Sequence, residues 1–161
     1  EPIRNEADIL IDTSELTPHD LKANIKKLFF NFKANSLSIS LKSFSYKRGL
    51  PRGADITLDC RFLKNPHWQD ELRKKTGLEP DVSKFVASDP KFPEFIERVT
   101  KLLLFLLPSF KEEGKSSVEI GFGCTGGMHR SVATTETVAK ELADSGWNVS
   151  IKHREIERLG L

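Results

Sequence analysis

The sequence predicts an α/β fold, with a mixed or mostly parallel central sheet flanked by helices. Segments of strand character alternate with segments of helical spacing along most of the 161 residues, and such alternation is typical of α/β layers. The run Ser117–Gly123 also becomes continuously apolar toward its end, as expected of a strand that is buried on both faces. We therefore expect a buried central strand followed directly by a helix.

The composition is that of a soluble globular protein. Hydrophobic residues make up 38% of the chain and charged residues 30%, with eleven phenylalanines, which excludes a disordered or membrane-embedded chain. The longest apolar run, Leu102–Pro108, is too short to span a bilayer. Because no signal peptide opens the sequence, we expect a cytoplasmic protein with no membrane partner. The first residue is Glu1 rather than methionine, so we expect part of a longer protein.

The numbers of cysteines and of charged residues bear on whether the chain has disulfides, a metal site or a surface for nucleic acid. Cys60 and Cys124 are too few for a disulfide framework or a zinc cage, so we expect free thiols and no metal site. The net charge of +2 permits nucleic-acid binding without requiring it. Basic residues cluster in one stretch, which is either a solvated surface or a surface for polyanions. These residues are Lys42, Lys47, Arg48, Arg52, Arg61 and Lys64.

The N-terminal segment predicts one strand, Ala7–Asp12, and one helix. Thr17 suits the N-cap of the helix, Pro18 its first position, and Asp20 the acidic position of a capping box. The polar stretch after Asn31 marks a boundary. The apolar residues that recur at helical spacing are Leu21, Ile25, Leu28 and Phe29.

Four strands and three helices are expected beyond this boundary. The strands are Leu37–Phe44, a segment from Ala54 whose end presents Asp59, Cys60 and Arg61, Ser117–Gly123, and a return strand beginning near Asn148. The helices are a short one around Gln69–Lys75, a long one from Pro93 through Leu107, and one beginning at Arg130 or Ser131. Trp68 is assigned to the core. The long helix is predicted to bury Phe92, Phe95, Ile96, Val99, Leu102, Leu103 and Leu106, and the third helix Val132, Val138 and Leu142.

The stretch FGCTGGMHRSV, residues 122–132, carries the candidate site. A loop that leaves a strand at Cys124 and enters a helix near Arg130 gathers backbone N–H groups at a helix N-terminus, which favours an anion. Gly126 and Gly127 would let the backbone curl without a Cβ penalty. Arg130 supplies a planar fork matched to phosphate oxygens. His129 would add a donor when protonated, and Ser131 would cap the helix or bond the ligand.

The same loop has the spacing of a catalytic cysteine site. Cys124, Arg130 and Ser131 match the Cys-x5-Arg-Ser loop of protein tyrosine phosphatases, and the helix start would lower the pKa of the thiol. The general acid would have to come from Asp70 or His67, and no acid-bearing loop is identifiable. Alternatively, Cys124 is a small buried hydrophobe and the glycines mark a tight turn without a ligand.

Several motifs in order resemble the C-terminal domain of the RapZ family, called YvcJ in Gram-positive bacteria. They are SYKRGLPRGAD, DCRFLKNPHW, ELRKKTGLEPDV and GCTGGMHRS, and the resemblance runs from about Leu37 to Arg158. Ile3–Phe30 resembles the last strand and helix of the family's N-terminal P-loop domain. We therefore expect residues 1–33 to be the tail of that domain with a linker, and residues 34–161 to be the ligand- and RNA-binding domain.

The resemblance implies a regulator rather than an enzyme. No G-x-x-x-x-G-K-[ST] motif occurs here, so ATP or GTP binding is expected in the P-loop domain and no cofactor in this chain. In the family this domain binds a small regulatory RNA, presents it to an endoribonuclease, is proposed to sense glucosamine-6-phosphate, and assembles as a homo-oligomer. The ligand site carried over to this chain comprises His67, Cys124, Thr125, Gly126, Gly127, His129, Arg130 and Ser131.

The chain departs from the family at two places: one weakens the expected RNA site, and the other, at Met128, removes a possible donor from the loop. The chain ends in KHREIERLGL, in which Glu155 and Glu157 dilute the basic residues, and Met128 replaces the usual lysine or glutamine.

His67 could instead cap a turn beside Pro66, and Asp59 and Arg61 could pair with each other's neighbours to orient the loop. A cysteine-dependent phosphatase and a structural oligomerisation domain remain the alternative functions. RNA contacts are expected from Lys47, Arg48, Arg52, Lys64, Lys152, Arg154 and Arg158.

Overall fold

The computed structural model describes residues 11–29 and 37–161 and divides the chain into two units, 1–35 and 36–161. The described part of the first unit contains one helix, α2 (Pro18–Phe29). Its start is the predicted capping box: the Asp20 carboxylate accepts from Thr17 N at 3.1 Å, and Thr17 Oγ1 accepts from Asp20 N at 3.2 Å. The strand predicted for Ala7–Asp12 falls mainly outside the described residues.

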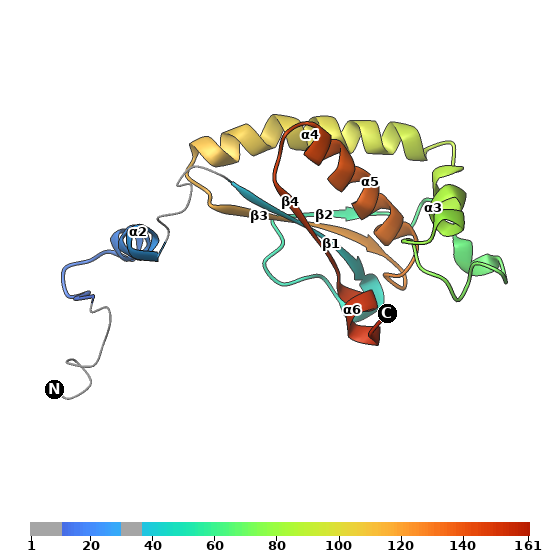
Figure 1. The fold of residues 1–161 in the computed structure, drawn as a ribbon, viewed down its shortest axis with the longest axis horizontal. Coiled ribbons are helices and arrows are strands. Elements are labelled where there is room, and N and C mark those ends of the chain that lie inside the picture. The colour runs from blue at the N-terminus through green and yellow to red at the C-terminus, as the bar shows by residue number, and fades with distance from the viewer. Residues whose placement is uncertain (1–10, 30–36) are drawn as a thin grey trace. The chain divides into compact units, whose positions relative to one another are not determined.

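The second unit is built on a parallel four-stranded sheet in the order β2-β3-β1-β4 (Figure 1), which confirms the predicted α/β class. The strands are β1 (Ser38–Ser45), β2 (Ile56–Asp59), β3 (Ser117–Cys124) and β4 (Val149–His153). The two central strands, β1 and β3, pair along their whole length. The carboxyl ends of all four strands therefore point toward one edge of the sheet.

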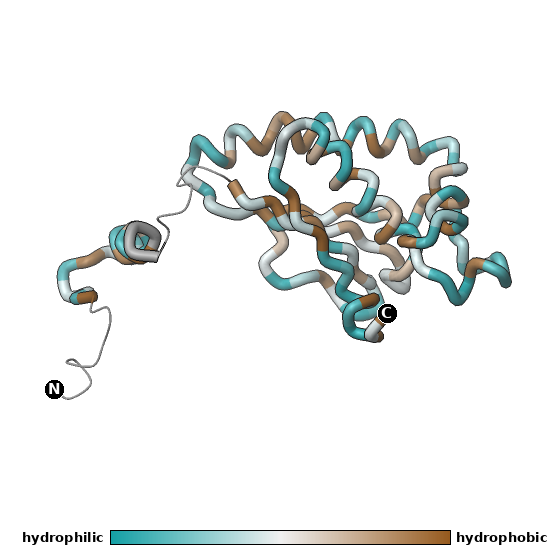
Figure 2. Tube along the Cα trace, in the orientation of Figure 1, coloured by the Kyte–Doolittle hydropathy of each residue, from teal (hydrophilic) through white to brown (hydrophobic). Residues whose placement is uncertain are grey.

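Four helices accompany this sheet: α3 (Pro80–Ala87), α4 (Phe92–Glu112), α5 (Arg130–Asp144) and the short α6 (Arg154–Leu159). Figure 1 shows α4 and α5 on the same side of the sheet. Hydrophobic residues are concentrated in the strands and recur along α4 (Figure 2). None of the described helices combines the length and hydropathy needed to cross a membrane. The core between these helices and the sheet includes Ile39, Leu41, Leu103, Leu107, Ile120, Phe122, Val138 and Leu142.

The other face of the sheet is polar toward the start of the strands and aromatic toward their end. Because side chains alternate along a strand, Lys42 and Phe44 of β1 project to this face, where Lys42 pairs with Glu119 of β3. Phe44 is buried over two glycines of β3: a Cβ added at Gly123 would lie 2.5 Å from its ring, and one at Gly121 3.1 Å. The glycines in β3 thus make room for an aromatic ring, and the face near Lys42 stays polar.

The segment between β2 and α4 differs from its prediction. Gln69–Lys75 forms successive turns rather than a helix, and the helix in this region is α3, which was not predicted. With only one apolar residue among five charged ones, Gln69–Lys75 has no apolar face to pack, and a short isolated helix is unstable. Trp68 is not in the core: it ends the short 3-10 helix η2 (Pro66–Trp68) and is 75% exposed.

The long helix α4 exists as predicted but continues past Leu107, through Pro108, to Glu112. Its buried side includes Leu103 and Leu107, which are spaced i, i+4 and completely buried. Leu102 was predicted to be buried and is 46% exposed, because the next residue occupies the core position. The buried side chains of α4 are Phe92, Ile96, Val99, Thr100, Leu103 and Leu107.

Two substitutions in α4 test this orientation. Leu103→Ala removes a fully buried side chain and should lower the free energy of unfolding by about 2–5 kcal/mol. Phe105→Ala removes a larger side chain that is 74% exposed and should change it by no more than about 0.5 kcal/mol. Urea unfolding of both variants checks this, and equal losses would contradict the assigned faces.

Candidate ligand loop and basic surface

The ligand loop, residues 125–129, lies at the carboxyl edge of the sheet, where parallel α/β sheets commonly bind ligands. β3 ends at Cys124 and α5 begins at Arg130, as predicted. Gly127 has φ +70°, and a Cβ there would lie 2.5 Å from Glu155 Cγ and 2.9 Å from Ser45 N. Gly126 has no such constraint, because a Cβ there would meet open space. The fold therefore requires glycine at position 127 but not at 126.

The sulfur of Cys124 contacts both the ligand loop and the first turn of α5. Its Sγ lies 3.1 Å from Ser131 Oγ and accepts the Gly127 N–H at 3.2 Å. The side chain of Ser131 does not cap α5, because the hydroxyl faces the thiol and is completely buried. Cys124 itself is only 3% exposed, so its sulfur would have to be uncovered before it could attack a substrate. These contacts favour a structural role for the thiol.

The guanidinium of Arg130 connects the loop to the segment that follows β2. Arg130 is 5% exposed, and its Nη1 donates to the carbonyl oxygens of Arg61 at 2.6 Å and Leu63 at 3.2 Å. Its Nη2 donates to Thr125 Oγ1 at 3.2 Å. Nε is buried and has no hydrogen-bond partner among the described residues. The guanidinium, which was predicted to bind a phosphate, thus donates most of its hydrogen bonds to other atoms of the protein. The buried Nε–H has no such acceptor among the described residues.

His129 contributes a second buried nitrogen without a partner. Its Nε2 makes no hydrogen bond to any residue that the structure describes. Burial lowers the pKa of His129, and the positive charges of His67 and Arg130 lower it further, against the opposing effect of the backbone at Lys75 and Arg73. The neutral ring is therefore favoured, so His129 offers one N–H donor rather than the two of a protonated imidazole.

The segment that carries His67 packs against the ligand loop. Gly77 N donates to Met128 O at 2.8 Å, and a Cβ at Gly77 would lie 2.4 Å from His129 O. His67 is exposed in η2, where the Asn65 side chain, not His67, provides the cap. Gly77 was missed by sequence reasoning, although a glycine between charged segments can signal such a close backbone approach. The fold thus brings His67 into the neighbourhood of His129.

Asp59 and Arg61 pair with each other rather than with each other's neighbours. Arg61 Nη2 lies 2.6 Å from Asp59 Oδ2, and the guanidinium lies 4.1 Å from the centre of the Tyr46 ring. The hydrogen bond from Arg61 is the largest cause of the lowered pKa of Asp59. This pair holds the end of β2 in place, and the carbonyl of Arg61 then receives Arg130.

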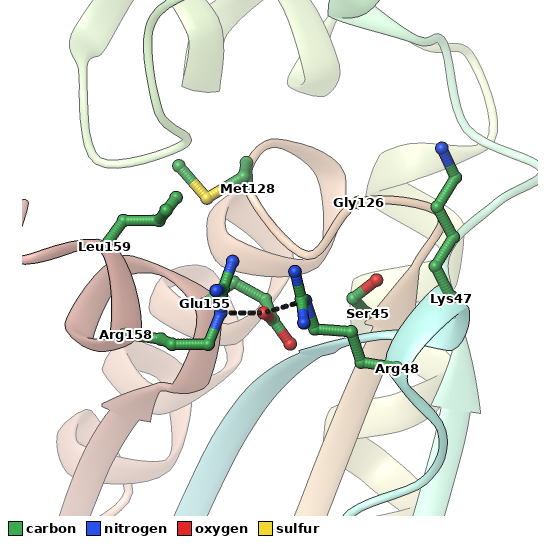
Figure 3. Close-up of a pocket in the computed structure, with 8 residues that line it drawn as sticks. All are labelled: Ser45, Lys47, Arg48, Gly126, Met128, Glu155, Arg158 and Leu159. Atoms are coloured by element: carbon green, nitrogen blue, oxygen red, sulfur yellow. Dashed lines mark hydrogen bonds and ion pairs between the residues drawn. The ribbon is translucent and has the colours of Figure 1, made fainter.

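Two neighbouring cavities, which together we call the basic surface, lie along β1, β4 and α6. The first, of about 370 Å³, is shown in Figure 3 and includes Gly126 of the ligand loop. The second, of about 310 Å³, includes Lys42 and Lys152, which are register partners on β1 and β4. Arg48 lines both. The cations of the basic surface are Lys42, Lys47, Arg48, Arg52, Lys152, Arg154 and Arg158.

The structure brings together most of the basic residues that were predicted to contact RNA. Lys64 is separate from them: its Nζ donates to Ser88 O at 3.0 Å, and it lines neither cavity. Lys42 was noted in the basic stretch but not assigned to the RNA site. Strand alternation was the signal that could have placed it beside Lys152, because both project from the same face of the sheet.

Glu155 is not exposed on the basic surface, so it does not reduce the positive charge there as an exposed carboxylate would. Its side chain is 3% exposed and lies 2.9 Å from Arg154 Nε, 3.2 Å from Arg158 Nε and 3.2 Å from Arg48 Nε. Glu157 is different: its side chain is 52% exposed and pairs with Lys152 at 3.2 Å. Glu155 therefore holds three arginines at the edge of the basic surface.

Residues 37–157 match the family model described as the RapZ C-terminal domain. The chain belongs to this family. Curated relatives of this RapZ domain include nucleotide-binding proteins of Cereibacter sphaeroides (54% identical) and Ruegeria pomeroyi (55% identical), each matched over 157 residues. A nucleotide-binding protein of Dinoroseobacter shibae is 48% identical over the same length. Each match covers 98% of this chain but 52–55% of the relative, so the chain spans about half the length of these relatives.

Family membership confirms the resemblance drawn from the motifs. The relatives are named for nucleotide binding. Within residues 11–29 and 37–161, no three His, Cys, Asp or Glu side chains are grouped so that they could hold a metal ion. The two candidate sites of the described chain are the ligand loop and the basic surface beside it.

The packing of Gly127 can be tested directly. Gly127→Ala should lower the free energy of unfolding by roughly 2–5 kcal/mol, because a left-handed backbone and a clash with Glu155 both disfavour a Cβ there. Gly126→Ala is the matched control and should be nearly neutral. Chemical denaturation of both variants measures the difference, and a neutral Gly127→Ala would contradict the described loop.

Proposed function

We propose that this RapZ domain senses a phosphorylated amino sugar of the glucosamine-6-phosphate type on its ligand loop and binds a small regulatory RNA on its basic surface. The observation that carries the proposal is a pair of buried nitrogens at the start of a 15-residue helix, Arg130 Nε and His129 Nε2, which have no hydrogen-bond partner among the described residues. By family analogy, the domain presents the RNA to an endoribonuclease as part of a cytoplasmic homo-oligomer. Nucleotide binding then resides in the other half of the parent protein.

The buried Nε–H of Arg130, which has no partner among the described residues, favours an anionic ligand on energetic grounds. A buried polar group without a partner costs about 1–3 kcal/mol, and an oxyanion could accept a hydrogen bond from Arg130 Nε and from the amides at the start of α5. Thr125 and Gly126 are exposed, so a ligand can reach the loop from solvent. His67 is also exposed, and its charge affects the pKa of His129, so we assign it to a hydroxyl of the sugar.

The basic surface favours a polyanion because its positive charge is in excess. Seven cations line it, whereas the carboxylates paired with them are Glu119, Glu155 and Glu157. Arg52 has no ion-pair partner among the described residues. Phosphate contacts from lysine and arginine supply most of the non-specific affinity for nucleic acids, so this surface suits an RNA backbone.

Sugar-phosphate sensing can be measured by thermal unfolding. Glucosamine-6-phosphate at one hundred times its Kd should stabilise the chain by about 2.7 kcal/mol and raise Tm by several degrees. His67→Ala should weaken this effect but leave stabilisation by inorganic phosphate unchanged, because the exposed side chain would contact only the sugar. Arg130→Lys should weaken both, and urea unfolding of that variant separates lost binding from lost folding.

The alternatives predict different results in the same experiment. Cys124→Ser should retain the ligand-induced shift in either case, so turnover of an aryl phosphate decides: a sensor shows none, whereas a cysteine-dependent phosphatase shows turnover that is lost in this variant. If neither sugar phosphates nor inorganic phosphate shift Tm at millimolar concentration, the sensing function is wrong and a structural oligomerisation domain is favoured.

RNA binding can be measured by fluorescence anisotropy with a structured small RNA. Affinity should fall steeply between 50 and 200 mM salt, roughly tenfold or more, because several cations release counterions from the RNA. Arg52→Ala with Lys152→Ala should weaken binding and make the salt dependence shallower. Lys64→Ala is the control, since Lys64 lies outside the basic surface. Binding that is independent of salt, or equally sensitive to Lys64→Ala, would argue against this surface.

A further inference from the structure

The two cysteines of the chain lie opposite each other at the ends of neighbouring strands. Asp59, the last residue of β2, is the register partner of Gly123 on β3, and these strands lie side by side (Figure 1). The ladder continues for one more residue, because Cys60 N donates to Gly123 O at 2.7 Å. In a parallel ladder this bond places Cys60 opposite Cys124. Register partners project to the same face of a sheet, and both cysteines belong to the hydrophobic core.

The spacing of the pair suits a disulfide that forms and breaks. Both residues are free cysteines. Neighbouring strands lie about 4.7–4.9 Å apart, and disulfides span Cα separations of about 4.4–6.8 Å. The two Cβ atoms must approach to about 3.8 Å, so the bond would draw the strand ends together and would be strained. Strained disulfides are easily reduced and are typically regulatory rather than structural.

Burial decides the order in which the two thiols react. Cys60 is completely buried, and burial raises its pKa to about 12, so it remains a thiol at neutral pH. Cys124 is 3% exposed and its sulfur is bonded to the ligand loop. A small oxidant therefore reaches Cys124 first, when the loop opens locally, and Cys60 is the thiol that then closes the bond.

A hydroperoxide supplies the oxidant, and the reaction balances in two steps. The Cys124 sulfur attacks one peroxide oxygen, the O–O bond breaks, and the released hydroxide takes the thiol proton and leaves as water. Cys124 then carries a sulfenic acid. The Cys60 sulfur attacks the Cys124 sulfur, the S–O bond breaks, and the hydroxide leaves as a second water with the Cys60 proton. Two thiols are thus oxidised to a disulfide, and one hydrogen peroxide is reduced to two waters.

The disulfide would act on the ligand loop because Cys124 now holds it. Its Sγ accepts the Gly127 N–H at 3.2 Å and lies 3.1 Å from Ser131 Oγ at the start of α5. A sulfur bonded to Cys60 has to move toward β2, and it leaves these contacts. The bond would therefore release the loop and the first turn of α5 from their shared sulfur.

We infer that Cys60 and Cys124 form a redox site, which a hydroperoxide oxidises reversibly to a disulfide that releases the ligand loop from Cys124. This inference goes beyond the proposed function. It needs neither the sugar phosphate nor RNA, because the oxidant acts on the chain's own thiols.

The bond is tested by peptide mapping of the chain treated with hydrogen peroxide. Remaining thiols are blocked with iodoacetamide, and the chain is digested with trypsin, which places the two cysteines in residues 53–61 and 116–130. These peptides should appear as one linked species that dithiothreitol separates. Oxidation of Met128 adds an oxygen to the same species and is distinguished by its mass. Cys60→Ala is the control: it keeps Cys124 but should accumulate sulfenic and sulfinic acid there.

Release of the loop is tested by amide hydrogen exchange at Gly127, followed by NMR. Oxidation removes the acceptor of this N–H, so its exchange should become at least about threefold faster, and dithiothreitol should restore the slow rate. Cys60→Ala treated with the same peroxide should keep the slow rate while its Cys124 is still reduced.

Each outcome decides one part of the inference. Peptides that stay separate while both cysteines are oxidised, or a disulfide that joins two chains, would overturn the redox site. A linked pair with unchanged exchange at Gly127 would show that the loop is not released. Should Cys60→Ala fail to fold in urea titrations, Cys124→Ser replaces it as the control: a chain that lacks this sulfur has to give no linked species. None of these results depends on whether sugar phosphate or RNA binds, so failure of the proposed function is recognised separately.

Discussion

The hydrogen bonds of the buried Arg130 guanidinium hold the candidate site together. The segment after β2 and the loop after β3 are far apart in sequence, and the carbonyls of Arg61 and Leu63 share one guanidinium with Thr125 Oγ1. Buried charges need such partners, because the loss of hydration is otherwise uncompensated. The same side chain thus links the segments at this edge of the sheet, and its Nε has no hydrogen-bond partner within residues 11–29 and 37–161.

Close backbone approaches bring the remaining parts to this edge. Gly77 lets the segment containing His67 approach the start of α5, and Gly127 lets the loop pass Glu155 and Ser45. Neither approach leaves space for a Cβ, so both depend on glycine. By contrast, Gly126 faces open space. It is suited to a position where the backbone approaches a ligand rather than another part of the protein.

The arrangement of charge explains how a chain with a net charge of only +2 can present a basic surface. Cations from β1, β4, α6 and the segment after β1 gather around two adjoining cavities, while Glu155 is withdrawn from solvent between three arginines. Glu94 and Glu97 instead pair with neighbours on the exposed side of α4. The distribution of charge, and not its total, is what suits this face to a polyanion.

Periodicity and local motifs were sufficient for the α/β class, for all four strands of the second unit, and for the strand–loop–helix at Cys124–Arg130, because apolar spacing and flanking turn residues are properties of neighbouring positions in the sequence. The capping box at Thr17 and Asp20 was predictable for the same reason. Trp68 and Leu102 were misplaced, since burial depends on which side of a turn or helix meets the core. The helix α3 was missed because it has few residues and follows a long polar segment.

The sequence by itself determined the family of this chain and the boundaries of the candidate ligand loop, because the order and spacing of residues carry both. Only the tertiary structure decided the strand order, the partners of Arg130 and the place of Glu155. Each of these depends on segments that meet through folding and not through the chain. Glu155, which seemed from the sequence to weaken a basic tail, lies buried against Gly127 and organises the arginines around it.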